Sequence, residues 1–292
     1  IDTTVRNRMN PIDTWLRRNW RRDEAALKAL SGTRPALIVT GGSDGIGHAI
    51  ARELSGSDRT TVLIARHKDR LERAAEGIRK DTGATCLMLP LDVRRPDTPE
   101  QIRALLAAHD LYADILVNSA GIGTTGEFQS EVAENIDAVT DLNVTALTRL
   151  TRAFMPDMLV RGRGGIINIA SLGGFLPGPY QAAYYATKAH VISLTRAIAW
   201  ENRGRGVRIT TVAPGPVNTE FHARAHGETS LYRRILPGVA PETVARATRR
   251  GYALGLGIIV PGVFPTLLSL AVRVLPGALT IPAMAFLLKP RS

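Results

Sequence analysis

Seven short runs of apolar, often β-branched residues recur along the chain from Pro35 onward, separated by longer stretches with helical patterns. The runs occupy residues 36–40, 60–65, 84–91, 113–120, 164–171, 207–215 and 257–262. Their apolar character is continuous and does not alternate, which is typical of strands buried on both faces. Such strands, separated by helices, predict an α/β fold with a doubly wound, seven-stranded parallel sheet and helices on both faces.

Helical patterns fill the gaps between these runs, at 47–55, 68–80, 131–160 and 182–202. The last two present more apolar positions than packing on one sheet requires. We therefore expect them to contact a second copy of the chain in a homodimer or homotetramer with twofold symmetry.

Composition places the chain among globular proteins of the cytoplasm. Its 292 residues can build one large core, 45% of them are hydrophobic, and the mean hydropathy is +0.00. A lone cysteine, Cys86, cannot form an intramolecular disulfide, which fits a reducing compartment.

No secretory signal is recognisable, although the chain starts at Ile1 and not at methionine. The histidines show no ligand spacing with cysteine or clustered carboxylates, so no metal site is expected.

The formal charge of +11 raises the question of nucleic-acid binding, which depends on clustered Lys and Arg. Residues 1–30 carry seven basic and four acidic side chains, a net charge of +3, and the remaining positive charge is spread along the chain. A diffuse positive field predicts no nucleic-acid partner. It suits an acidic partner, or peripheral contact with an anionic membrane surface, better.

An amphipathic segment precedes the first strand. Ile12, Leu16 and Trp20 recur every four residues with arginines between them, which predicts a helical extension over residues 1–33. Packing on the protein itself or on a neighbouring subunit is one interpretation, and anchoring on a membrane surface is the other.

An apolar segment ends the chain. Residues 251–272 contain no charge, but glycines and prolines interrupt them, which predicts a last strand, a turn and a short helix in place of a transmembrane span. The tail over residues 263–292 is expected to wrap the substrate pocket or a subunit contact.

The segment TGGSDGIG, residues 40–47, follows the first strand and opens the first helix. Gly41 permits a tight turn, Gly45 lets the backbone approach a pyrophosphate, and Gly47 permits close helix packing. The N-terminus of the helix then faces the anion. This position between strand and helix predicts a dinucleotide site.

The glycine spacing is G-x-x-x-G-x-G, and six further motifs follow it. They are LDV at 91–93, NSAG at 118–121, Asn143 in DLNVTALTRLT, Ser171 in NIAS, YYATK at 184–188 and PGPVNT at 214–219. In this order the motifs resemble the short-chain dehydrogenases/reductases, and the stretch with VNTEFHARA and the apolar tail is similar to their acyl-type subgroup. The resemblance implies a Rossmann-like catalytic domain over residues 34–262.

The family pattern Y-x-x-x-K selects one of two adjacent tyrosines. Tyr184 lies four residues before Lys188 and thirteen after Ser171, so Tyr185 should point into packing or a subunit contact. The resemblance implies that Tyr184 exchanges a proton with the substrate oxygen, which Ser171 holds. The ammonium of Lys188 should lower the pKa of Tyr184. Asn143, by the same resemblance, stabilises a bent helix and holds a water behind Lys188.

The end of the second strand indicates the cofactor. An acidic residue there would accept hydrogen bonds from the ribose hydroxyls of NAD, but the chain has Ala65, followed by Arg66, whose guanidinium can pair with a 2′-phosphate. NADP is therefore predicted in preference to NAD, although Asp44 stands where some NADP users place a basic residue. The residues expected to bind the cofactor are Gly41, Ser43, Gly45, Ile46, Gly47, Arg66, Asp92 at the adenine, Val93, Asn118, Ala120, Gly121, Tyr184, Lys188, Pro214, Gly215, Val217 and Thr219.

Two loops beyond the strands are expected to select the substrate. Their apolar side chains are Phe175, Leu176, Tyr180, Phe221, Leu231, Tyr232 and Ile235. They predict a bulky hydrophobic carbonyl or alcohol of 3-oxoacyl, steroid or lipid type, with an acyl thioester among the candidates. An oxidoreductase acting on such a substrate is the first hypothesis. The alternative is a dinucleotide-binding sensor or scaffold without turnover.

Overall fold

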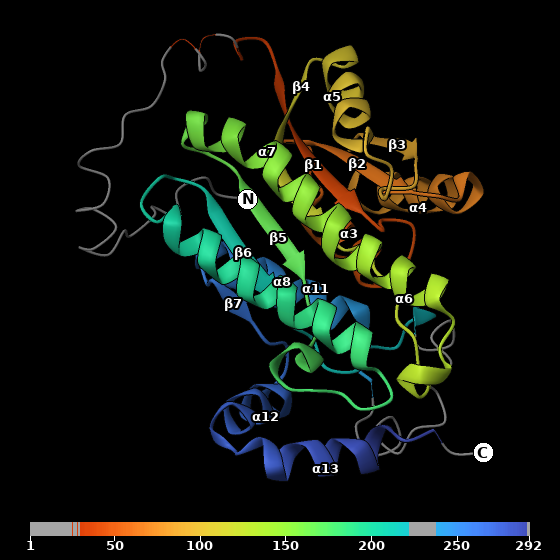
Figure 1. Cartoon of the computed structure of the whole chain (residues 1–292). Helices are drawn as coiled ribbons and strands as arrows, with labels where there is room; N and C mark the ends of the chain where they lie inside the picture. The colour runs from red at the N-terminus through yellow and green to blue at the C-terminus, as the bar shows by residue number, and fades with distance from the viewer. Residues whose placement is uncertain (1–24, 26–27, 29, 222–237, 291–292) are drawn as a thin grey trace.

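The computed structural model describes residues 25, 28, 30–221 and 238–290, and its core is a single seven-stranded sheet (Figure 1). The strands lie in the order β3-β2-β1-β4-β5-β6-β7, and every neighbouring pair is parallel. They are β1 (Arg34–Thr40), β2 (Thr60–Ala65), β3 (Cys86–Pro90), β4 (Leu111–Asn118), β5 (Gly165–Ile169), β6 (Arg208–Val212) and β7 (Ile258–Ile259). The predicted doubly wound sheet is confirmed. The helical extension expected over residues 1–33 and the loop residues Leu231, Tyr232 and Ile235 lie outside the described residues, apart from residues 25, 28 and 30–33 of that extension.

Helices cover both faces of the sheet, as the continuous apolar strands require. One face is covered by α3 (Gly45–Leu54), α4 (Lys68–Thr82) and α11 (Pro241–Ala253). The other is covered by α5 (Thr98–Ala108), α7 (Leu147–Arg161) and α8 (Ala182–Glu201). Each layer buries its own apolar core against the strands.

The helix predicted over residues 131–160 contains an irregular turn. It consists of α6 (Ala133–Thr140), the π-helical segment η3 (Asp141–Ala146) and α7. A π-helical turn inserts an extra residue per turn and is common at functional sites. Here it contains Asn143, where the resemblance implied a bend.

The strand order creates a switch point beside β1. This strand pairs with β2 on one side and with β4 on the other, with Thr40 opposite Ile64 and Asn118. The connections that leave β1 and β4 therefore diverge to opposite faces of the sheet. A crevice forms at the carboxyl ends of strands at such a point, which is where open α/β sheets bind ligands.

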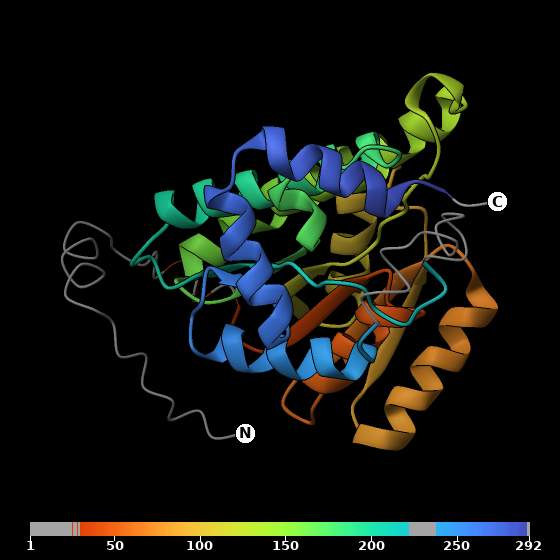
Figure 2. The ribbon, with the colours of Figure 1, turned by 90° about the horizontal axis from the view of Figure 1, so that it is seen from below.

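The C-terminal part follows the predicted strand, turn and short helix. After α11 and β7 come α12 (Val263–Val274) and α13 (Gly277–Leu288), which lie together beyond the carboxyl ends of the central strands (Figures 1 and 2). Among the residues that the structure describes, none of the helices has the length and apolar character needed to cross a membrane.

Candidate active site

A cleft of about 520 Å³ opens at the carboxyl end of the sheet, at the switch point. It is lined by the turn after β1, by the segments after β4, β5 and β6, and by the first turns of α8. Fifteen of the predicted site residues meet there: Gly41, Ser43, Gly45, Ile46, Gly47, Arg66, Ala120, Gly121, Ser171, Tyr184, Lys188, Pro214, Gly215, Val217 and Thr219. Segments far apart in the sequence thus form one site.

The glycine loop, residues 40–47, packs tightly against the turn that follows β4. Gly41 has a φ of +66°, and a Cβ atom there would lie 2.9 Å from the backbone of Ala120. Thr40 holds the two turns together, since its Oγ1 accepts hydrogen bonds from the amides of Ser119 and Ala120 at 3.1 and 3.3 Å. Sequence reasoning missed Thr40, whose signal was a polar side chain at the end of a buried strand.

The N-terminus of α3 points into the cleft. The helix begins at Gly45, which lines the cleft together with Ile46 and Gly47. Asp44 caps it, because its Oδ1 accepts a hydrogen bond of 2.6 Å from the amide of Gly45. The partial positive charge of a helix N-terminus favours a bound anion. Arg66 adds a full positive charge to the same cleft.

Ser171, Tyr184 and Lys188 come together from β5 and α8. Ser171 follows β5 and caps the short helix η4 (Leu172–Phe175), and its Oγ accepts a hydrogen bond from the amide of Gly173 at 3.1 Å. Lys188 is buried, and its Nζ donates to the carbonyl of Ile169 at 3.0 Å. The same Nζ lies 5.7 Å from the centre of the Tyr184 ring.

Burial changes the acidity of both groups. It raises the pKa of Tyr184 to about 12, and a hydrogen bond with Ser171 acts in the opposite direction. It lowers the pKa of Lys188 to about 8. The pKa of Tyr184 is therefore raised and not lowered as expected, because desolvation of the buried phenolate is the main cause of its shift.

The second tyrosine lies in a tightly packed region. Tyr185 is 5% exposed, and its ring is so close to Gly173 and Gly178 that a side chain on either glycine would meet it. The residue borders the cleft, but its ring packs edge-on against that of Tyr184.

Asn143 lies behind the cleft and not on its surface. Its Oδ1 accepts from the amide of Ile122 at 3.0 Å, and its Nδ2 donates to the Ile122 carbonyl and to Thr187 Oγ1. Thr187 in turn donates to the carbonyl of Tyr184. The side chain therefore joins the turn after β4 to the helix that carries Tyr184 and Lys188.

Two further predicted cofactor residues do not line the cleft. Asn118 is buried, and its Nδ2 donates to Thr151 Oγ1 and to Asn168 Oδ1 at 3.1 and 2.8 Å. Val93 packs in the apolar core. In this structure the Asn118 side chain therefore links β4 to β5 and to α7.

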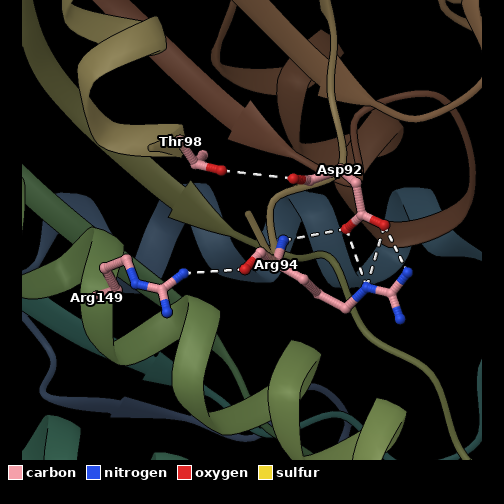
Figure 3. A network of polar contacts seen from close by, with 4 residues as sticks. All are labelled: Asp92, Arg94, Thr98 and Arg149. Carbon is pink, nitrogen blue, oxygen red and sulfur yellow. Dashed lines mark hydrogen bonds and ion pairs between the residues drawn. The ribbon is translucent and has the colours of Figure 1, made fainter. Parts of the chain in front are cut away.

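Asp92 also lies outside the cleft lining, in a polar network that sequence reasoning missed (Figure 3). Arg94 donates to both carboxylate oxygens, at 2.6 to 3.1 Å, and Arg149 donates to the carbonyl of Arg94 at 3.0 Å. The hydrogen bonds from Arg94 hold the pKa of Asp92 below its ordinary value. The Asp92 carboxylate is thus oriented by Arg94, two residues further along the chain.

The apolar loop residues are only partly arranged as expected. Phe221 lines the cleft and lies 5.4 Å from the Tyr184 ring, measured between ring centres. Leu176 and Tyr180 are not part of the lining, and Phe175 packs instead beneath the guanidinium of Arg273. Polar residues missed by the sequence reasoning complete the wall, namely Thr124, Thr125, Glu131, Asn135 and Gln181.

Comparisons with known proteins agree with this geometry. The family described as short chain dehydrogenase matches residues 35–229. Ketoacyl reductase HetN of Nostoc sp. is 35% identical over 219 residues, 74% of this chain and 74% of that protein. Very-long-chain 3-oxoacyl-CoA reductase of Anas platyrhynchos is 32% identical over 215 residues, 72% of this chain and 66% of that protein. The solved short-chain dehydrogenase from Sphingobium yanoikuyae in complex with NADPH has a TM-score of 0.71 and 31% identity, covering 81% of this chain and 92% of that one.

Proposed function

The chain belongs to the short-chain dehydrogenase family, and on this premise we propose that it is an NADP-dependent reductase of bulky hydrophobic ketones. The observation that carries the proposal is the meeting of Ser171, Tyr184 and Lys188 in one cleft with a glycine loop. Among hydrophobic carbonyls we place 3-oxoacyl thioesters first, with support from the two relatives named as ketoacyl and very-long-chain 3-oxoacyl-CoA reductases.

The proposed chemistry divides a reduction between the cofactor and three side chains. When bound, NADPH supplies the hydride that reaches the carbonyl carbon. Ser171 donates a hydrogen bond to the carbonyl oxygen, and Tyr184 gives that oxygen its phenolic proton. The charge of Lys188 stabilises the phenolate that this transfer leaves. Burial raises the pKa of Tyr184 to about 12, so the phenol carries the proton that this step requires.

Several features of the chain fit a dinucleotide. Gly41 has no room for a side chain, and Gly45, with a φ of +56°, lies against Thr219 across the loop. The N-terminus of α3 suits the pyrophosphate. Ala65 leaves no carboxylate at the end of β2, and Arg66 suits a 2′-phosphate. We assign Asp92, Val93 and Asn118 to the adenosine side as a proposal, the last two through their backbone.

The cofactor choice can be tested at Arg66. Arg66→Ala should weaken NADPH binding at least about tenfold, because a charge-assisted pair with the 2′-phosphate is lost, and should leave NADH binding nearly unchanged. Cofactor fluorescence titrations measure both constants. An unchanged preference for NADPH would contradict the assignment.

The activity can be tested by NADPH consumption with a panel of 3-oxoacyl thioesters of increasing chain length, steroid ketones and small aldehydes. Tyr184→Phe serves as the blank. Turnover that grows with the apolar part of the substrate is expected. Tight NADPH binding without turnover on any member would instead favour a sensor or scaffold that has the fold without the reaction. The oligomer, homodimer or homotetramer, is a separate prediction that sedimentation of the same protein tests.

A further inference from the structure

We infer that the outward faces of α12 and α13 form a binding surface for an anionic phospholipid membrane beside the cleft. This C-terminal apolar surface comprises Val263, Leu267, Leu270, Val274, Leu279 and Ile281. The inference rests on the packing and charge of the two helices and does not require the proposed reaction.

The outward face of α12 is apolar where a surface helix is ordinarily polar. Val263, Leu267, Leu270 and Val274 follow one another at spacings of four, three and four residues, so they lie on one side of the helix. Their exposed fractions run from 53% to 81%. Ser269 is the buried residue of this helix, which means that α12 packs on the protein with its more polar side.

Helix α13 is apolar on every side. Its sequence, GALTIPAMAFLL, has Thr280 as its one polar side chain, and Leu288 is its one buried residue. A helix that is hydrophobic all round is normally buried in a large core or in lipid. Leu279 and Ile281 are instead 63% and 40% exposed.

The surface adjoins the cleft. Helix α12 packs on η4, the segment that follows Ser171, and the guanidinium of Arg273 lies 4.4 Å from the centre of the Phe175 ring. A Cβ atom on Gly215, which lines the cleft, would lie 3.3 Å from Pro265 in α12. Both helices lie on the side of the molecule toward which β5 points (Figure 1). A bound membrane would therefore lie next to the cleft.

Charge favours an anionic membrane over a second copy of the chain. After Glu242 the sequence has no Asp or Glu, whereas Arg273 and Lys289 belong to α12 and to the end of α13. A twofold dimer through this surface would bring the same cations of both copies together. Anionic headgroups would complement them, while the leucines enter the interface between headgroups and acyl chains.

The test is cosedimentation of the full chain with phosphatidylcholine vesicles, with and without phosphatidylserine. The chain should sediment with the anionic vesicles, less with the neutral ones, and less at high salt. Leu267→Glu should lower the partition coefficient about tenfold, because one leucine no longer leaves water. The matched control is Leu254→Glu, which adds the same charge at a leucine that is 74% exposed on another part of the molecule. It should change binding by no more than about twofold.

Three results would overturn the inference: no sedimentation with either vesicle, equal losses in the two variants, or a concentration-dependent dimer that Leu267→Glu dissociates while vesicles bind nothing. Thermal unfolding of both variants checks that they fold. Because binding is measured without substrate, failure here leaves the proposed reductase activity untouched, and failure of turnover leaves this inference untouched.

Discussion

Helix α8 and the pair α12 and α13 depart from ordinary burial in opposite directions. Charged side chains are rarely buried, yet α8 buries Lys188. Large apolar side chains on a surface are common singly but not in rows, yet α12 exposes a row of four. On α8 the buried charge lies beside the cleft, and on α12 the exposed row faces away from the protein. Each departure thus marks a place where we expect the chain to meet another molecule.

The largest effect is expected from the paired tyrosines of α8. Tyr184→Phe should lower turnover by roughly a thousandfold, because the proton donor is lost, while NADPH binding is retained. Tyr185→Phe, one position along the same helix, should spare turnover. NADPH oxidation and cofactor titration on the two variants measure this difference. Equal losses in both would remove the distinction between a reacting and a packing tyrosine.

The next effect concerns the cost of burying Lys188. Lys188→Met should raise the free energy of unfolding by about 2 kcal/mol at pH 7, although turnover is lost. The reason is that the folded-state pKa of about 8 lies below the ordinary 10.5, so the charged lysine opposes folding at neutral pH.

The control for this prediction is how the stability difference between Lys188→Met and the wild-type chain changes with pH. Between pH 8 and about 10.5, Lys188 is more protonated in the unfolded wild-type chain than in the folded one. The free energy of unfolding of the wild-type chain therefore rises with pH in this window. The advantage of Lys188→Met should therefore shrink across this window. Chemical denaturation at pH 7 and pH 10 measures it, and an equal gain at both values would mean that burial does not oppose the charge.

A smaller effect should follow from crowding the packing side of α8. Gly178→Ala places a methyl group against the Tyr185 ring and should lower the free energy of unfolding by about 1.5 kcal/mol. Gly77→Ala in α4 is the matched control, since in the described part of the chain the added carbon meets nothing within 4 Å besides its chain neighbours and the backbone of its own helix. It should stabilise the chain slightly. Comparable thermal shifts in the two variants would show that Tyr185 is less tightly held than its contacts indicate.

The smallest effect is expected at α12. Leu267→Glu should change the free energy of unfolding by less than about 0.5 kcal/mol, because an exposed leucine contributes little to folding. Denaturant titration measures this value. A loss comparable to that of a core substitution would show that Leu267 packs within the protein, and the contrast between α8 and α12 would disappear.

Much of the fold could be predicted because its determinants are local. A strand buried on both faces needs a continuous apolar run, and each of the seven runs became a strand. Gly41 and Gly47 were predictable for a similar reason, since a tight turn between strand and helix restricts side chains at fixed positions. The π-helical turn at 141–146 was not predicted, because nothing in the periodicity of residues 131–160 distinguishes it.

The surroundings of the site residues were harder to predict. Asn118 and Asp92 were assigned to the cofactor, but their side chains bond to Asn168 and Arg94. Phe175 was assigned to the substrate pocket and instead lies under Arg273, nearly a hundred residues further along the chain. The partners of Asn118 and Phe175 come from other elements, so no short stretch of sequence identifies them, whereas Arg94 lies only two residues from Asp92.

By itself, the sequence determined the order of strands and helices and the glycine turn, because these depend on periodicity and on spacing within one element. The choice of Tyr184 over Tyr185 stays a prediction that follows from the resemblance to the family. The tertiary structure alone decided that burial raises the pKa of Tyr184, that Lys188 is held by Ile169, and that the row on α12 faces outward. The desolvation of a side chain and its exposed fraction both depend on all the residues that surround it. Those residues come from distant parts of the sequence, and only the folded chain brings them together.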